Sequence, residues 1–548
     1  KALTLGGANL EGFAGIGGPY RYGNDVLGNG RLDEGEDLNR NNLLDPGEDA
    51  PDGILDTVNE SAVGLEIHNV DFGFAIMRPT ALDAFAAAGE FLKLYDPKWV
   101  TAKASIQRAG LVGIDENVLS AEVFDVEVNI NTFLIDAPVP VTAVLQVFGP
   151  PVINYKQSPS FKTFTEDTNG NGKLDFGEDK NANLRLDPGE DLDGDNILDL
   201  SEDRNQNGKI DTAGFALPAG GNNMVFIDFE SEIIQAKVGY AEINLGGVLQ
   251  MSASMAFTKR SGEQVTLSNG ETTTVTTMAI GINDANAFLG IPVGGHGYFY
   301  DSNGDDRIDE ADDTNQSAIG LVIEDFDLGL IIAAETYISM QRVSIGVYLA
   351  GRATVKEVKL NGVPGVTMAV RDLALEINLG VRASLNLGQI VKDPTTGAVS
   401  YQANVQPSFG LTTIDFSKST WTRPAEDTNG NGKLDVGEDR GNGMLDPGED
   451  LNGNGSLDAG EDIGNGVLDP RQEGLEGYAI ETGNPFEPIV LQYKSLFLRV
   501  FGEVEVNLFG LAKLDGVLDF RFSESEGLTA FADVSVSVGP DGFNIKAD

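Results

Sequence analysis

Acidic loops of fixed length dominate this sequence and limit what it can fold into. Four stretches, residues 25–60, 166–211, 301–313 and 426–469, hold roughly half of the 85 Asp and Glu residues of the 548-residue chain. Like charges at that density repel one another and keep a segment extended unless a cation neutralises them. These stretches are therefore either solvated linkers or metal sites, and the order of their residues distinguishes the two.

The loop that begins at residue 167 places oxygen ligands at alternate positions. Positions 1, 3, 5, 7, 9 and 12 are Asp167, Asn169, Asn171, Lys173, Asp175 and Glu178. Alternate residues of a tight loop point toward one ion, Gly172 at position 6 allows the sharp turn, and position 7 offers its backbone carbonyl. This is the EF-hand calcium-loop pattern, and its oxygen ligands suit Ca²⁺ better than Mg²⁺.

Three more loops follow this one with a period of 12 residues. Their candidate ligands are Asp179, Asn181, Asn183, Arg185, Asp187 and Glu190, then Asp191, Asp193, Asp195, Ile197, Asp199 and Glu202, then Asp203, Asn205, Asn207, Lys209 and Asp211. The period leaves no room for the flanking helices that a calcium-sensing EF-hand needs. The tandem order resembles the calcium-loop ladders of thrombospondin type 3 repeats, which implies that the ions act as the core of a segment with little apolar content.

The other acidic stretches contain the same loop less regularly. Near the start the candidate ligands are Asp25, Asn29, Arg31, Asp33 and Glu36, with Leu27 at position 3, and then Asp37, Asn39, Asn41, Leu43, Asp45 and Glu48. A single loop has Asp301, Asn303, Asp305, Arg307, Asp309 and Asp312. The last stretch has Asp427, Asn429, Asn431, Lys433, Asp435 and Glu438, a shortened loop with Asn442, Met444, Asp446 and Glu449, and then Asp450, Asn452, Asn454, Ser456, Asp458 and Glu461.

The competing interpretation of these stretches is an acidic linker whose Asn-Gly and Asp-Gly turns imitate ligand spacing. Several loops in register, with Leu, Ile or Met kept at position 8, favour calcium, and we expect about 8 to 11 bound ions. Loops rich in Asn carry less charge and bind more weakly, on the order of 10⁻⁴ to 10⁻³ M as in extracellular modules. We therefore expect an extracellular or cell-surface protein.

Composition excludes several classes of function. A formal net charge of −48 argues against a nucleic-acid partner. The chain has no cysteine and only two histidines, His68 and His296, so thiolate sites and histidine-based triads are not expected. No apolar run approaches the roughly 20 residues of a spanning helix, and we expect no membrane span. The first residues form no secretory signal, so we expect a removed signal or one stretch of a longer array.

The chain repeats itself over roughly 275 residues. The segment 61–76 is echoed at 317–332, residues 3–20 resemble 278–299, and Val126–Asn129 matches Leu375–Asn378. We therefore divide the chain into copy 1, residues 1–277 with loops at 25–60 and 166–214, and copy 2, residues 278–548 with loops at 301–313 and 426–472. Both copies carry acidic loops at the same two points.

Between the loops apolar and polar residues alternate with period two, as in half-buried antiparallel strands. We predict an all-β fold in which the two copies form a sandwich or an elongated sheet, with turns or bulges at Gly246-Gly247, Ser268-Asn269-Gly270 and Asn361-Gly362-Val363-Pro364. The one helical candidate follows Pro79, where Thr80 and Asp83 resemble an N-terminal cap ahead of Ala84 to Leu92. An outer-membrane protein would need aromatic girdles and lipid-facing apolar bands. We take the outward positions to be Lys, Ser, Thr and Gln, which disfavours that class.

The repeat resembles modules of very large secreted bacterial proteins of poorly known role, through its "SAxGL", "NAFLG" and "DSNGD" elements. We expect a calcium-stabilised structural protein that self-associates through strand edges into a filament or layer. The alternative is a calcium-dependent adhesin or glycan-binding module, in which Trp99 or Trp421 stacks on sugars, although each is better explained as pinning a strand edge. We expect no enzyme, because the carboxylates outside the loops, Glu66, Glu122, Glu127 and Glu376, lie in strands where an exposed face is the simpler explanation.

Overall fold

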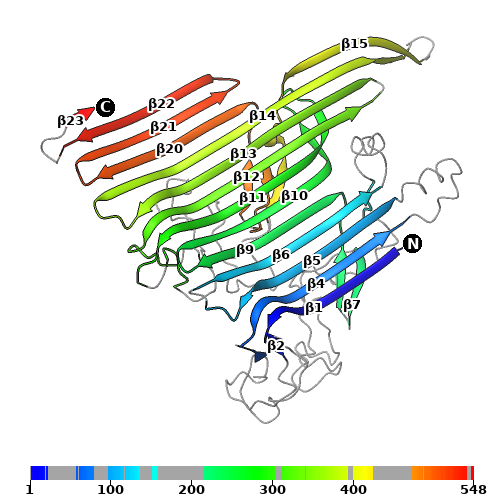
Figure 1. The fold of residues 1–548 in the computed structure, drawn as a ribbon. Helices are drawn as coiled ribbons and strands as arrows, with labels where there is room; N and C mark the ends of the chain where they lie inside the picture. The colour runs from blue at the N-terminus through cyan, green and yellow to red at the C-terminus, as the bar shows by residue number, and fades with distance from the viewer. Residues whose placement is uncertain are drawn as a thin grey trace, which may run out of the picture.

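A computed structural model shows an all-β protein built on one large antiparallel sheet (Figure 1). It describes residues 2–18, 20–22, 57–59, 61–78, 97–115, 118–135, 151–157, 214–220, 223–294, 297–302, 308, 312–339, 341–392, 399–423, 472–485, 487–539 and 545–547. The predicted all-β class is confirmed, and the one helical segment in these ranges is the short η3 (Phe416–Lys418). The helical candidate at 84–92, with its cap at 80–83, lies outside them.

Within the described ranges, we find no helix with the length and apolar character needed to cross a membrane.

The main sheet has fifteen strands, of which fourteen lie in a row that follows chain order. The first seven are β1 (Ala2–Ile16), β4 (Val63–Met77), β5 (Lys98–Val112), β6 (Ser120–Leu134), β9 (Ile233–Leu245), β10 (Leu249–Thr266) and β11 (Thr272–Ile291). The next seven are β12 (Ile319–Ile338), β13 (Arg342–Asn361), β14 (Val366–Lys392), β20 (Phe497–Leu508), β21 (Ala512–Ser523), β22 (Gly527–Val538) and β23 (Ile545–Ala547). β15 (Val399–Leu411) pairs with the end of β14.

Tight turns connect many neighbouring strands, and the three breaks predicted as turns or bulges are turns between strands. Gly246 and Gly247 join β9 to β10 with φ of 58° and 66°, Gly270 joins β10 to β11 with φ of 83°, and Gly362 follows β13 with φ of 74°. Glycine adopts this left-handed region without a steric penalty, so the glycines fix where each strand reverses.

A second set of left-handed residues lies inside the strands and consists of Asn and Asp. Their φ values fall between 49° and 54° in six strands, at Asn9 (β1), Asn69 (β4), Asp125 (β6), Asp284 (β11), Asp325 (β12) and Asp372 (β14). Asn and Asp tolerate this conformation better than other residues with a side chain. The register shifts at several of these positions, as between Ile282 and Ala285, so they mark a line of β-bulges.

The same hydrogen bonds support the bulges in both halves of the sheet. Asp71 Oδ1 accepts from the backbone N–H of Asn9 at 2.8 Å, and Asp327 Oδ1 accepts from that of Asp284 at 3.1 Å. Asp71 and Asp327 occupy matching positions in the repeated segments 61–76 and 317–332. Asn9 and Asp284 occupy matching positions in the segments 3–20 and 278–299. The repeat boundary near residue 278 falls inside β11, which pairs with β10 on one side and β12 on the other.

The two faces of the sheet are the reverse of the expected arrangement. In β10 the polar residues Ser252, Ser254 and Thr258 are buried, whereas Met251 and Phe257 are 50% and 38% exposed. The prediction that Lys, Ser, Thr and Gln point outward is therefore wrong. We call the side of Thr258 the covered face and the side of Phe257 the open face.

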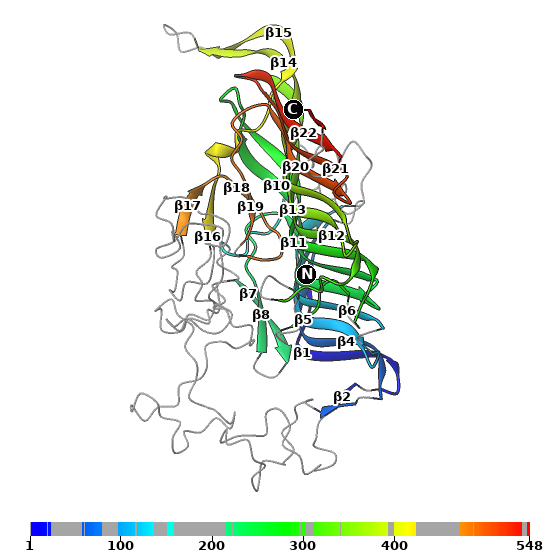
Figure 2. The same ribbon diagram turned by 90° about the vertical axis from the view of Figure 1, so that its left-hand side faces the viewer.

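Short segments of the chain cover one face only (Figure 2). They form small sheets of β7 (Phe215–Gly220) with β8 (Asn223–Ile227), β16 (Thr420–Arg423) with β17 (Gln472–Glu476), and β18 (Tyr478–Ile480) with β19 (Ile489–Leu491). A further separate pair is formed by β2 (Arg21–Tyr22) with β3 (Thr57–Val58).

The apolar core lies between the covered face and these segments. Ile331, Ala333 and Tyr348 of the main sheet pack there with Ile480 and Leu491 of the small sheets. The close approach depends on glycine, because a Cβ on Gly281 would lie 2.1 Å from the carbonyl oxygen of Glu481. Burial of each such apolar side chain stabilises the fold by about 1.5–3 kcal/mol.

Candidate calcium loop and the covered face

The loop from residue 301 to 312 is the one acidic loop of which the structure describes both ends. Asp312 Oδ1, at position 12, accepts hydrogen bonds from the Ser302 backbone N–H at 2.8 Å and from the Ser302 hydroxyl at 3.1 Å. Just outside the loop, Phe299 and Thr314 form an antiparallel bridge. The first and last ligand positions therefore lie at the same end of a closed loop, as one bound ion requires.

The aliphatic residue at position 8 anchors this loop to the main sheet. Ile308 is buried in an aromatic cluster with Phe288, Tyr298 and Phe299, and its backbone N–H donates to the Tyr240 hydroxyl at 2.8 Å. Tyr240 belongs to β9. An ion bound in the loop would thus be tied to the covered face through position 8.

The remaining predicted ligands lie outside the described residues. This holds for Asn303, Asp305, Arg307 and Asp309 of the same loop, and for all candidate ligands in the segments 25–48, 167–211 and 427–461. The structure thus places Asp301 and Asp312 and brings their ends of the loop together.

A separate carboxylate cluster, which the sequence analysis did not single out, lies at the bulges of β11 and β12. Oxygens of Asp284, Asp325 and Asp327 lie within 4.8 Å of one another. Glu487 approaches from the covering segment and accepts hydrogen bonds from Asn283 at 2.8 Å and Asn484 at 2.6 Å. These oxygens could hold a cation, since carboxylates are ligands that Ca²⁺ prefers.

The same cluster retains protons more strongly than isolated carboxyls do. Burial, together with the charge and hydrogen bond of Asp284, raises the pKa of Glu487 to about 8. Burial also raises the pKa of Asp327 above its usual value. Protonation therefore relieves part of the repulsion between these carboxyls.

The equivalent place in the first half has different chemistry. There Asn9, Asn69 and Asp71 stand where the second half has Asp284, Asp325 and Asp327. Near these bulges lies another cluster of Glu11, Glu66 and His68, in which His68 Nδ1 is 2.8 Å from a Glu11 carboxylate oxygen. Glu66 is only 3% exposed, so its expected placement on an exposed face is wrong. Glu122, another of those carboxylates, pairs with Arg108 at 2.6 Å.

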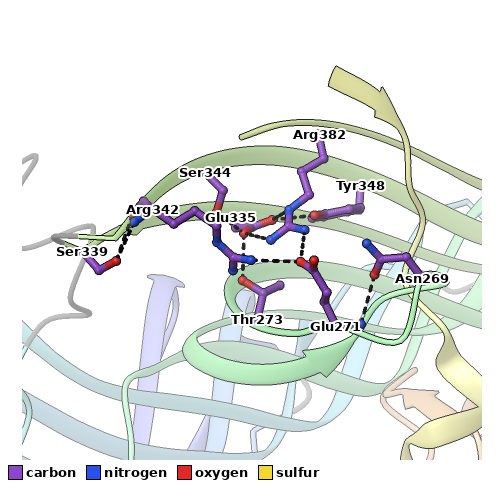
Figure 3. A network of polar contacts seen from close by, with 9 residues as sticks. All are labelled: Asn269, Glu271, Thr273, Glu335, Ser339, Arg342, Ser344, Tyr348 and Arg382. Atoms are coloured by element: carbon purple, nitrogen blue, oxygen red, sulfur yellow. Dashed lines mark hydrogen bonds and ion pairs between the residues drawn. The ribbon is translucent and has the colours of Figure 1, made fainter. Parts of the chain in front are cut away.

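An ionic network joins β11, β12, β13 and β14 on the covered face (Figure 3). At its centre Arg382 donates two hydrogen bonds to Glu335, and Thr273, Ser344 and Tyr348 donate three more. Burial opposes the ionisation of Glu335, but these hydrogen bonds outweigh it and hold the pKa of Glu335 below its usual value. The network rigidifies the sheet, and we assign it no chemical reaction.

Both arginines of the network also contact Glu271, which follows the turn into β11. Arg382 and Arg342 each donate to Glu271 Oε2. These bonds, the one from Arg382 foremost, hold the pKa of Glu271 below its usual value. The sequence offered no signal for this network, because its members are distant in the chain. Glu271 and Arg382 are more than 100 residues apart.

Trp99 is engaged in packing at a strand end. Its indole N–H donates to the Pro151 carbonyl, and its ring lies 5.7 Å from that of Phe133. Both contacts agree with the expectation that this tryptophan pins a strand.

Comparisons of the chain with protein-family models, curated proteins and solved structures give no match.

Proposed function

We propose that this protein is a calcium-stabilised structural protein of the extracellular space or cell surface, in which ion-binding loops brace one large sheet. The observation that supports this best is the attachment of loop 301–312 to the covered face. Ile308 is buried against Phe288 of the sheet, and Asp312 is hydrogen-bonded to the start of its own loop. Because the loop is attached to the sheet, an ion bound in the loop would also stabilise the sheet.

Calcium would act on stability through the order that it imposes. Fixing the backbone of one loop residue costs about 1–2 kcal/mol, which the acidic loops cannot recover from apolar burial. An ion that binds only the ordered loop supplies this free energy, so the stability of the protein rises with free calcium. Such a dependence suits a protein that assembles outside a cell.

Self-association would use the edges of the main sheet. Among the described residues β1 pairs only with β4, and β22 pairs with β23 over three residues beyond its contact with β21. Edge strands present unpaired N–H and C=O groups that can accept a strand of another molecule. We propose that calcium-braced molecules join through these edges into a filament or layer.

Calorimetry and melting of the full chain test the calcium proposal. We expect heat on titration with millimolar CaCl₂ and a higher Tm in CaCl₂ than in EGTA, with a smaller increase in MgCl₂. Asp301→Asn combined with Asp312→Asn should lose part of the calcium-induced increase in Tm, whereas Asp313→Asn, next to the loop, should retain it. No heat and no change in Tm with calcium would overturn the proposal.

Negative-stain electron microscopy tests the assembly separately. Ordered fibres or sheets in calcium that loosen in EGTA are expected. Dispersed monomers in both conditions, together with a normal calcium titration, would reject self-association and leave the calcium proposal standing. Calcium-dependent binding to a glycan array by such monomers would favour the adhesin instead.

A further inference from the structure

We propose that the open face of the main sheet contacts the acyl chains of a phospholipid bilayer. This surface is made by strand residues outside the acidic loops, and the proposal goes beyond the calcium-dependent role. It does not depend on that role.

Residues in register across the open face form long apolar rows. One row of the second half runs through Phe257, Ile280, Leu330, Ile377, Leu498 and Phe522, with Gly351 between Leu330 and Ile377. A row of the first half runs through Ile234, Ile130, Ala102, Phe74 and Leu5. All the residues named in these two rows are apolar. The first-half row ends at β10, where Lys259 lies next to Ile234 and pairs with Glu232 at 3.5 Å.

The next row on the covered face carries the charges. Beside the first of these rows it runs through Gly281, Gly329, Arg352, Glu376, Arg499 and Arg521. Arg499 lies 3.5 Å from Glu376 and 3.3 Å from Asp519. Polar residues thus pair with one another on the covered face, while apolar residues point outward on the open face. A sheet adapted to water has the opposite arrangement.

The apolar side chains of the open face are exposed over the whole width of the sheet. Leu3 in β1 is 67% exposed, Leu289 in β11 is 59% and Val538 in β22 is 56%. Thirteen strands from β1 to β22, at about 4.8 Å spacing, make a face about 60 Å wide. The largest apolar patch of a typical soluble monomer is roughly 300–600 Å², and this face is several times larger.

The length of the apolar band matches the interior of a bilayer. In β11 the open-face residues from Met278 to Ile291 are apolar, which at about 3.4 Å per residue is roughly 45 Å along the strand. A strand tilted by about 45° projects this length onto roughly 30 Å, the thickness of the hydrocarbon layer. A continuous apolar run does not occur in such a strand, because only alternate residues contact lipid.

Acyl chains fit this surface better than a second copy of the chain does. A partner protein that covered this face would have to match the shape of a broad twisted sheet over its whole area. A stable interface needs only about 800 Å² from each partner, which is a small part of this face. Fluid acyl chains adapt to any apolar relief and carry no charge. Hydrocarbon offers no hydrogen-bond partner, so the outer edges of β1 and β22 must be paired when the sheet is in lipid.

Single-cysteine labelling of the full chain tests the proposal, because the sequence has no native cysteine. Two pairs of neighbours differ only in the face they occupy: Leu5→Cys with Thr4→Cys in β1, and Val536→Cys with Ser537→Cys in β22. Each variant is labelled with an environment-sensitive fluorophore and mixed with phosphatidylcholine vesicles. We expect brominated acyl chains to quench the Leu5→Cys and Val536→Cys labels several-fold more than their neighbours, and iodide in water to show the opposite preference.

Two results would overturn the proposal. One is equal quenching within each pair of neighbours by the brominated lipid, with calcium present. The other is a full chain that stays in the bottom fraction of a vesicle flotation gradient and is dimeric in lipid-free buffer, with the labels at positions 5 and 536 protected from iodide. That outcome would assign the open face to a second copy.

Discussion

Arg382 donates two parallel hydrogen bonds of 2.9 Å to Glu335, with side-chain exposures of 7% and 0%. A buried ion pair must recover the cost of desolvating both charges, and here the geometry is bidentate and Glu335 has three further donors. The pair joins β12 to β14 across β13, so it fixes the relative position of three strands in the middle of the sheet.

Removal of the arginine should be strongly destabilising. Arg382→Met leaves the Glu335 carboxylate buried without its cation, and we expect a loss of about 3–5 kcal/mol in the free energy of unfolding, measured by urea denaturation. Arg342→Met is the matched control, because Arg342 pairs with the half-exposed Glu271, and it should cost less than about 1 kcal/mol. Equal losses in the two variants would contradict the central role of Arg382.

Glu487 should make stability depend on pH. Its pKa is raised to about 8 in the folded protein, mainly by burial, so the folded state holds a proton that the unfolded state releases near pH 4.5. The free energy of unfolding should therefore decrease as pH rises from about 4.5 to about 8. Glu487→Gln should flatten this part of the profile in urea denaturation, while Asp533→Asn on β22 should leave it unchanged. An unaltered slope in Glu487→Gln would show that the carboxyl titrates elsewhere.

The left-handed residues of the bulges should tolerate only certain substitutions. Asp372 has a φ of 49°, and a β-branched side chain in that region is strained. We expect Asp372→Val to lower the free energy of unfolding by about 1–2 kcal/mol or more, and Asp372→Asn or Asp372→Gly to be close to neutral. Thermal denaturation of the three variants checks this order. A neutral valine variant would mean that the bulge does not need its left-handed residue.

Asn131 and Asn378 should each hold covering segments in their own half of the protein. Both are completely buried, and each side-chain NH₂ donates to two backbone carbonyls, those of Ile153 and Ser231 in one case and of Ile414 and Ser495 in the other. Replacement by alanine leaves these carbonyls without that donor, which should cost about 1–3 kcal/mol at either site.

Chemical denaturation of Asn131→Ala and Asn378→Ala measures the two costs, with Asn129→Ala as the control on the same face. A large loss in one variant only would show that the two halves do not share this support.

The sequence predicted strands and turns well because both depend on local chemistry. Period-two alternation marks strands such as β10, and Gly270 or Gly362 marks where they reverse. Alternation does not say which set of residues is covered, and Thr258 rather than Phe257 lies inside. That choice depends on segments such as β18 and β19, which come from more than 200 residues away.

The match between the two halves was found in sequence but with an error of register. Asn129 was matched to Asn378, whereas the shared hydrogen bonds pair Asn131 with Asn378. Both alignments preserve the alternation, because a shift of two residues keeps every side chain on its face. Only the contacts with the covering segments distinguish them. The left-handed Asp125 and Asp372 then fall at matching positions as well.

Ile308 should couple the acidic loop to the sheet. Its side chain is buried against Phe288 and Tyr298, and Ile308→Ala should lower the free energy of unfolding by about 2–5 kcal/mol in calcium, while Ile308→Val should cost about 0.5–1.5 kcal/mol. If the ion holds the loop on the sheet through this residue, the cost of Ile308→Ala should be smaller in EGTA, where the loop contributes less. Urea denaturation of both variants in CaCl₂ and in EGTA measures this difference. An equal cost in the two conditions would show that Ile308 stabilises the sheet independently of any bound ion.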